Sequence, residues 1–280
     1  MEEILMKKIF TCLCLCILCL SLCGCELQEM KDAKELYDKE VERIKSEEEK
    51  LDKTIEDAQN YISKGYTPLD ENKINTLEEA IKEAKESKKE IPNCPNEVDK
   101  INETVKNDLS LIEYKTITEN IQTKEKELKD SVKQFKQLSN PTSDFVLDRL
   151  KDVTLITGMS AITEQTDPYG DLNKEKSYSG MVYFTSSLVD QNQVYIDEYD
   201  SYGDIYVDKG TDGGGCVEIF TTVEDAKRRN EYLGSFDGTI LSGGKHVVVG
   251  TLVVRTSNLL TATQQSELET AVIDALSKVE

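Results

Sequence analysis

Tryptophan is absent from this 280-residue chain, and His246 is its single histidine. Histidine is the side chain most often used for proton transfer near neutral pH and for zinc ligation. We therefore expect no catalytic residues, no metal site and no cofactor. Basic residues are also few, 34 against 54 acidic ones, for a formal net charge of −20. Because phosphate is repelled by such a surface, nucleic acid is not expected as a partner.

Apolar residues make up only 38% of the chain, which is low for a single compact domain and indicates an elongated polar part. Cysteine is almost confined to the start. Beyond residue 25 the chain has only Cys94 and Cys216, and whether these two form a disulfide stays open. The others are Cys12, Cys14, Cys16, Cys19, Cys23 and Cys25.

The opening segment has the pattern of a secretory signal. Lys7 and Lys8 precede an apolar run from 9 to 22. At about fourteen residues this run is shorter than the ~20 needed to cross a bilayer as a helix, and it matches a signal-peptide core. An uncleaved buried helical hairpin and a cysteine-rich metal loop are the alternatives. Met6 is a more natural start for this pattern than the acidic Met1.

The run ends in Leu22-Cys23-Gly24-Cys25, which resembles the lipobox of bacterial lipoprotein signal peptides. Cys23 departs from the usual alanine, serine or threonine. The resemblance implies that residues 1–24 are a cleaved signal peptide and that Cys25 carries the lipid, typically including palmitate. The chain would then be attached through Cys25 to the extracytoplasmic face of the cell membrane, where several acyl chains hold it stably.

Residues 25–138 are expected to form a helical stalk. Apolar residues recur at alternating spacings of three and four, which predicts a helix over 27–63 with an a/d heptad pattern. A second helix should end at Pro92, and a third should run from just after Asn96 to Leu138. Short connections favour an antiparallel helical bundle or coiled coil. Such a segment could act as a spacer or bind another envelope protein.

A linker at 139–143 precedes a domain over 144–280 that is richer in glycine, tyrosine and β-branched residues. We expect strands at 153–163, 180–185, 216–220 and 246–256, and helices at 144–151, after Thr222 and after Thr261. Strands alternating with helices on one side predict a small α+β sandwich. The whole chain is thus predicted to be α+β, with a helical bundle followed by this domain.

Three segments of this domain carry a resemblance: ITEQTDPYGDLNK, GTDGGGCVEIFTTVEDAKRRNEYLGSFDG and VVVGTLVVRTSNLLTATQQSELETAVIDAL. They are similar to a recurrent C-terminal domain of Gram-positive surface lipoproteins and of long surface proteins labelled EbhA. The resemblance covers about residues 144–279 and implies a cell-surface setting without an assigned activity. More distantly, a GTxVxR strand followed by a helix that opens with Leu-Thr is similar to PsbP-like lipoprotein domains.

Several acidic residues are candidates for ligand binding. Glu164, Asp167 and Asp171 crowd one turn with oxygen donors, as a calcium loop would, but they lack the spacing of an EF-hand and fit an ordinary tight turn. Asp212 lies in GTDGGG at 210–215, which lacks the lysine of a phosphate loop and is interpreted as a turn.

Arg255 lies inside an apolar predicted strand, where a buried guanidinium needs a carboxylate. Glu218, on another predicted strand, is its expected partner in a structural ion pair. His246 begins a strand and is expected on the surface.

These patterns predict a non-enzymatic surface lipoprotein that displays a binding domain toward an envelope protein or cell-wall partner. The alternative is a cell-envelope enzyme or enzyme regulator that acts through residues 144–280. That alternative requires a pocket in which Glu164, Asp167, Asp212 and Arg255 converge.

Overall fold

The computed structural model describes residues 2–196, 201–239 and 242–279, with side chains from Leu27 onward. The chain is α+β, as predicted, and divides into two compact units. The first unit takes residues up to 65 together with 72–127. The second takes 66–71 together with 128 onward, so that helix α4 contributes to both.

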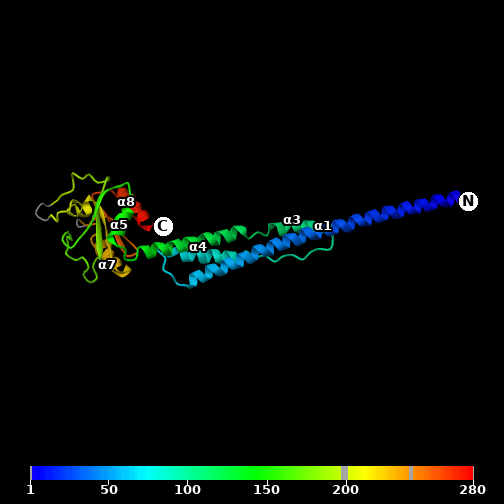
Figure 1. Ribbon diagram of the computed structural model, residues 1–280, viewed down its shortest axis with the longest axis horizontal. Helices are drawn as coiled ribbons and strands as arrows, with labels where there is room; N and C mark the ends of the chain where they lie inside the picture. Colours follow the sequence, from blue (N-terminus) through cyan, green and yellow to red (C-terminus); the bar gives the residue numbers. More distant parts are fainter. Residues whose placement is uncertain (1, 197–200, 240–241, 280) are drawn as a thin grey trace. The chain divides into compact units, whose positions relative to one another are not determined.

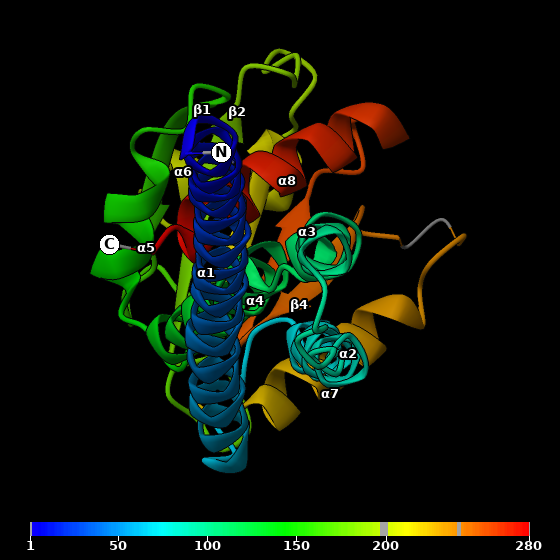
Figure 2. The same ribbon diagram turned by 90° about the vertical axis from the view of Figure 1, so that its right-hand side faces the viewer.

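The first unit is helical (Figure 1). Its long helix α1 (Glu2–Ser63) contacts α2 (Asn72–Glu86) and α3 (Val98–Asn107). The 3₁₀ helix η1 (Leu109–Leu111) and the start of α4 (Lys115–Gln137) complete it. Figure 2 views α2 and α3 nearly end-on beside α1. The antiparallel arrangement of the predicted bundle stays a prediction.

The heptad pattern on α1 predicts its buried face over much of its length. Ile44, Leu51 and Ala58 are completely buried. Near the start the pattern fails, because Leu27 is 73% exposed and Ala33 is buried in place of Lys34. A repeat of seven residues marks the apolar stripe only where another helix covers it.

The predicted third helix, from 97 to 138, is broken, and this part of the prediction is wrong. Between α3 and α4 the carbonyls of Leu109 and Ile112 accept hydrogen bonds of 3.1 Å from the guanidinium of Arg43. The backbone N–H of Tyr114 donates to Glu47 over 2.9 Å. Helix ends leave backbone groups without partners, and here side chains of α1 satisfy them.

The second unit is built on an antiparallel five-stranded sheet of order β1-β2-β3-β5-β4. The strands are β1 (Ile156–Ala161), β2 (Gly180–Ser186), β3 (Gly214–Ile219), β4 (His246–Val249) and β5 (Leu252–Thr256). Its helices are α5 (Ser143–Leu150), α6 (Ile205–Asp208), α7 (Val223–Gly234) and α8 (Ala262–Ser277), with a 3₁₀ helix η2 (Gly210–Gly213).

Helices cover both faces of this sheet, whereas the sequence predicted them on one side. Val182, Val217 and Val254 pack in one apolar cluster with residues of α5 and α8, and these two helices lie side by side (Figure 1). Cys216 and Val253 point to the other face, in a second cluster that includes residues of α6 and α7. Central strands that are apolar on both faces must be covered on both.

The segment 246–256, predicted as one strand, forms two strands joined by a turn at Gly250 and Thr251. Gly250 has φ of 62°, and a Cβ there would lie 2.8 Å from the carbonyl oxygen of Leu138. That carbonyl accepts hydrogen bonds of 3.0 Å from both the backbone N–H and the hydroxyl of Thr251. The turn is therefore held by the residue that follows α4.

Two of the helix starts predicted in the second unit, those after Thr222 and after Thr261, are confirmed by their caps. The Thr222 hydroxyl accepts from the backbone N–H of Asp225, and Thr261 forms a capping box with Gln264. The first cap sets where α7 begins and so which of its residues face the sheet.

Candidate functional site

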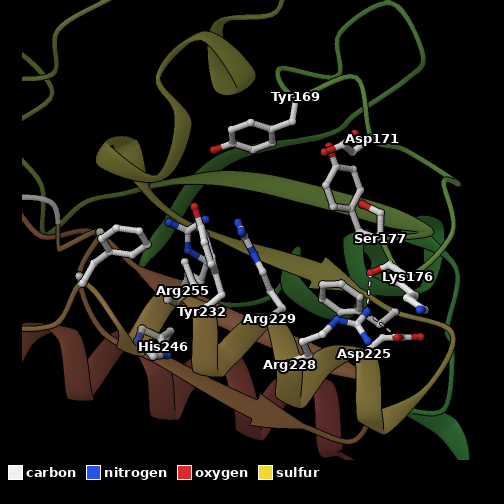
Figure 3. A pocket seen from close by; sticks show the side chains of 16 residues that line it. Tyr169, Asp171, Lys176, Ser177, Asp225, Arg228, Arg229, Tyr232, His246 and Arg255 are labelled. Carbon is white, nitrogen blue, oxygen red and sulfur yellow. Dashed lines mark hydrogen bonds and ion pairs between the residues drawn. The ribbon is translucent and has the colours of Figure 1, made fainter.

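A cleft of about 740 Å³ lies on the α7 side of the sheet in the second unit (Figure 3). Its volume falls within the range of small-molecule sites, roughly 300–1,000 Å³. Basic and aromatic side chains dominate its lining. The lining residues are Tyr169, Asp171, Lys176, Ser177, Tyr178, Phe220, Asp225, Arg228, Arg229, Tyr232, Leu233, Phe236, Gly243, Gly244, His246 and Arg255.

Strand register brings Glu218 and Arg255 together beneath this cleft. Arg255 pairs with Cys216 across β3 and β5, which places it diagonally from Glu218 on the same face. Nη1 of Arg255 lies 2.9 Å from Oε1 of Glu218, whose side chain is fully buried. The predicted ion pair is confirmed. Burial works against the charged form of Arg255, but the neighbouring Cys216 and Glu218 outweigh it and hold its pKa above the ordinary value.

Arg229 on α7 is a second partner of Glu218 that the sequence analysis missed. Its Nε and Nη2 lie 2.7 and 2.8 Å from the two carboxylate oxygens of Glu218. This is the bidentate geometry that makes arginine–carboxylate pairs strong. Burial lowers the pKa of Arg229, but hydrogen bonds to Glu218 overcome that effect and leave the pKa raised. The spacing in the sequence could have indicated this contact. Arg229 follows the apolar Ala226 by three residues, so both lie on the helix face that packs against the sheet.

Arg228 is engaged differently. Its Nη2 lies 2.6 Å from Oδ1 of Asp225 and donates to the carbonyl of Lys176 over 2.8 Å. Its side chain is 47% exposed, against 23% for Arg229. Arg228 thus carries a charge that its own helix already neutralises, at the margin of the cleft.

Aromatic rings form the more open part of the cleft. Tyr169 is 54% exposed and Tyr232 is 56% exposed. The guanidinium of Arg229 lies 5.5 Å from the centre of the Tyr232 ring, and Tyr232 packs edge-on against Phe236 at 5.1 Å. Figure 3 shows Arg229, Arg255 and Tyr232 pointing toward Tyr169. These rings offer stacking surface directly beside the arginines.

His246 is not the surface residue that the sequence predicted, since its side chain is only 10% exposed. Its Nδ1 lies 2.8 Å from Oδ1 of Asn230, and its Nε2 lies 3.4 Å from Oδ1 of Asp237. Strand β4 is at the edge of the sheet, where exposure is expected, but α7 packs over it. The position of His246 at the start of a strand did not indicate that a helix would pack over it.

The acidic candidates do not converge. Asp167 is occupied by its own turn, because its carboxylate accepts from the N–H groups of Tyr169 and Leu172 and from the Tyr178 hydroxyl at 2.5 Å. These hydrogen bonds lower its pKa even though burial acts in the opposite direction. Among the described residues, no group of three or more histidine, cysteine or acidic side chains is placed to hold a metal ion.

The other three acidic candidates are not gathered in the cleft. Asp171 lines the cleft and lies 3.1 Å from Nζ of Lys174. Glu164 and Asp212 are exposed and do not line it. Asp212 belongs to η2, so the first four residues of GTDGGG form a 3₁₀ helix and the last two begin β3, whereas the sequence predicted a turn. Of the four residues that the enzyme alternative requires, only Arg255 lines the cleft.

The described cysteines do not provide a reactive thiol in the cleft. Cys94 is exposed, Cys216 is buried, and both are free, so the disulfide left open by the sequence is not formed. Burial raises the pKa of Cys216 to about 12, which keeps its thiol protonated at neutral pH. The side chain of Cys25, the predicted lipidation site, lies outside the described residues.

Comparisons with protein-family models, with curated proteins and with solved structures find no match to this chain. The resemblance of residues 144–279 to surface-lipoprotein domains therefore stays a prediction. Within the described part of the chain, no helix has the length and apolar character needed to cross a membrane.

Proposed function

We propose that this protein is a lipid-anchored extracytoplasmic protein that binds a ligand with its second unit and performs no chemistry on it. Acylated Cys25 attaches it to the membrane, the helical segment to residue 138 connects the anchor to the sheet domain in the chain, and the sheet domain carries the binding site. The anchor is supported by the lipobox-like Leu22-Cys23-Gly24-Cys25 that ends a short apolar run.

The observation that carries the binding role is the cleft, whose principal charged groups are held by other protein groups. Glu218 accepts hydrogen bonds on both oxygens from Arg229 and a third from Arg255, and Asp225 is paired with Arg228. Groups fixed in this way orient a ligand, since their positions are set before it arrives. A catalytic carboxylate would instead be expected to reach the substrate with a free oxygen.

Fractionation of the producing cells tests the anchor. The unaltered chain is expected in the membrane fraction and should be removed from intact cells by added protease. Cys25→Ser should appear in the soluble extracytoplasmic fraction, whereas Cys23→Ser, the matched control two residues earlier, should stay with the membrane. If Cys25→Ser remained membrane-bound, the lipid anchor would be wrong.

Retention of envelope material tests the binding role. Full-length chain, immobilised in non-ionic detergent, is expected to retain a component of an envelope extract. Tyr232→Ala, which alters an exposed ring of the cleft, should reduce that retention, and Tyr66→Ala, an exposed tyrosine outside the cleft, should not. Equal retention by both variants would place binding elsewhere in the chain.

A further inference from the structure

We propose that the cleft binds a small anion that carries a ring, with its oxyanion on Arg229 and Arg255 and its ring against Tyr169 and Tyr232. The inference rests on the proposed binding function, for which it names the class of ligand. The oxyanion is a carboxylate or a phosphate, since a pair of guanidinium groups can donate hydrogen bonds to either.

The charge around Glu218 is unbalanced in favour of an anion. One fully buried carboxylate faces two guanidinium groups, whose side chains are 9% exposed for Arg255 and 23% for Arg229. Within this group of three side chains, two guanidinium charges against one carboxylate leave one positive charge over, in a chain whose net charge is −20. An anion inside this cleft meets an attraction that most of the acidic surface does not offer.

Donors remain available after Glu218 has been satisfied. Its carboxylate takes Nε and Nη2 of Arg229 and Nη1 of Arg255. Nη1 of Arg229 and Nη2 of Arg255 are not among its contacts. A Cβ on Gly243 would lie 2.8 Å from Nη2 of Arg255, so a glycine at this lining position lets the guanidinium keep its place at the cleft. Glu218 thus fixes the two guanidinium groups and leaves Nη1 of Arg229 and Nη2 of Arg255 as donors for a ligand.

The tyrosines indicate that the ligand has a ring. Tyr169 and Tyr232 are both more than half exposed and adjoin the arginines (Figure 3). Buried apolar rings would be explained by core packing, but exposed ones around a cleft offer stacking for a planar group. The cleft volume of about 740 Å³ holds a small molecule. A polyanion such as nucleic acid does not fit, because the Glu218 group offers one surplus positive charge and the chain as a whole is strongly acidic.

Binding of defined probes to the full-length chain in non-ionic detergent tests the inference. Benzoate and phenyl phosphate each join an oxyanion to a ring, and benzamide is the neutral analogue. By isothermal titration calorimetry at least one of the two anions is expected to bind with a Kd of about 1 mM or tighter, and benzamide at least about tenfold more weakly. Comparing the two anions shows whether carboxylate or phosphate is preferred.

Variants locate the binding. Arg229→Gln should weaken the anion at least about tenfold, whereas Arg228→Gln, the same charge change on the neighbouring residue, should weaken it less than about threefold. Because Arg229→Gln leaves Glu218 with one partner and can disturb the fold, Tyr169→Ala provides a second test. It removes an exposed ring and should weaken benzoate or phenyl phosphate while leaving the circular dichroism spectrum unchanged.

Three results would overturn the inference: no saturable binding of either anion up to about 10 mM, equal affinity for benzamide, or equal effects of Arg228→Gln and Arg229→Gln together with no effect of Tyr169→Ala. These failures are distinguishable from failure of the proposed function. Membrane release of Cys25→Ser and retention of envelope material do not require the ligand to be an anion.

Discussion

Arg229 donates through Nε and Nη2 to both carboxylate oxygens of Glu218, over 2.7 and 2.8 Å, and so ties α7 to the central strand β3. The carboxylate is fully buried, and Arg255 from β5 supplies a third hydrogen bond. A buried carboxylate costs several kcal/mol of solvation, which its partners must offset. This three-residue group therefore sets both the position of α7 and the charge of the cleft.

Arg229→Ala should destabilise the second unit by about 2 kcal/mol or more, because it removes two charge-assisted hydrogen bonds from a buried carboxylate. Arg228→Ala is the matched control. The Arg228 side chain is 47% exposed and its removal leaves no fully buried carboxylate behind, so its loss should cost less than about 1 kcal/mol. Urea unfolding followed by circular dichroism measures both. Equal effects would mean that Glu218 is not held as described.

Gly250→Ala should destabilise the second unit by about 2 kcal/mol or more. The new Cβ would combine a positive φ of 62° with a contact of 2.8 Å to the Leu138 carbonyl oxygen. Gly170→Ala separates the two causes, since Gly170 has φ of 63° and nothing within 4 Å of the added Cβ. That control should cost only about 1 kcal/mol. Thermal unfolding compares them, and equal shifts in Tm would argue against the contact with Leu138.

Asp167 should make the free energy of unfolding fall at acidic pH. Its pKa is lowered in the folded state, so its contribution is fully present above the unfolded pKa of about 4 and is lost as pH falls through the folded pKa. Asp167→Asn should reduce stability at pH 7 and flatten the loss below pH 4. Glu164→Gln, an exposed neighbour with the same charge change, should leave the profile as it is. Urea midpoints measured across this pH range test the difference.

Cys94 and Cys216 should differ sharply in labelling. The exposed Cys94 is expected to react with iodoacetamide at pH 8 within the time of a routine labelling reaction, and the buried Cys216, with a pKa of about 12, only after unfolding. Peptide mapping by mass spectrometry separates the two sites from the cysteines before residue 26. Rapid labelling of Cys216 in the folded chain would contradict its burial.

Local patterns in the sequence were sufficient for much of the secondary structure. Hydroxyl caps at Thr222 and Thr261 placed the starts of α7 and α8, and the heptad pattern marked Ile44, Leu51 and Ala58 as buried. An arginine inside an apolar strand predicted its partner Glu218, because a buried guanidinium requires a carboxylate. These features depend on residues close in the chain or on a strict local requirement.

The failures involve contacts between distant residues. The break between α3 and α4 depends on Arg43 and Glu47 of α1, and the turn at Gly250 depends on Leu138. The pattern of apolar residues within either segment does not indicate these distant partners.

The sequence by itself determined the α+β class, the charge of the surface, the capped helices and the pairing of Arg255 with Glu218. Only the tertiary structure decided that α7 covers the second face of the sheet, that Arg229 joins the pair, and that His246 is enclosed. The physical reason is that a cleft forms where helices and loops pack against a sheet. Its lining residues are spread from 169 to 255. Sequence periodicity predicts each helix or strand separately and does not indicate which of them pack together.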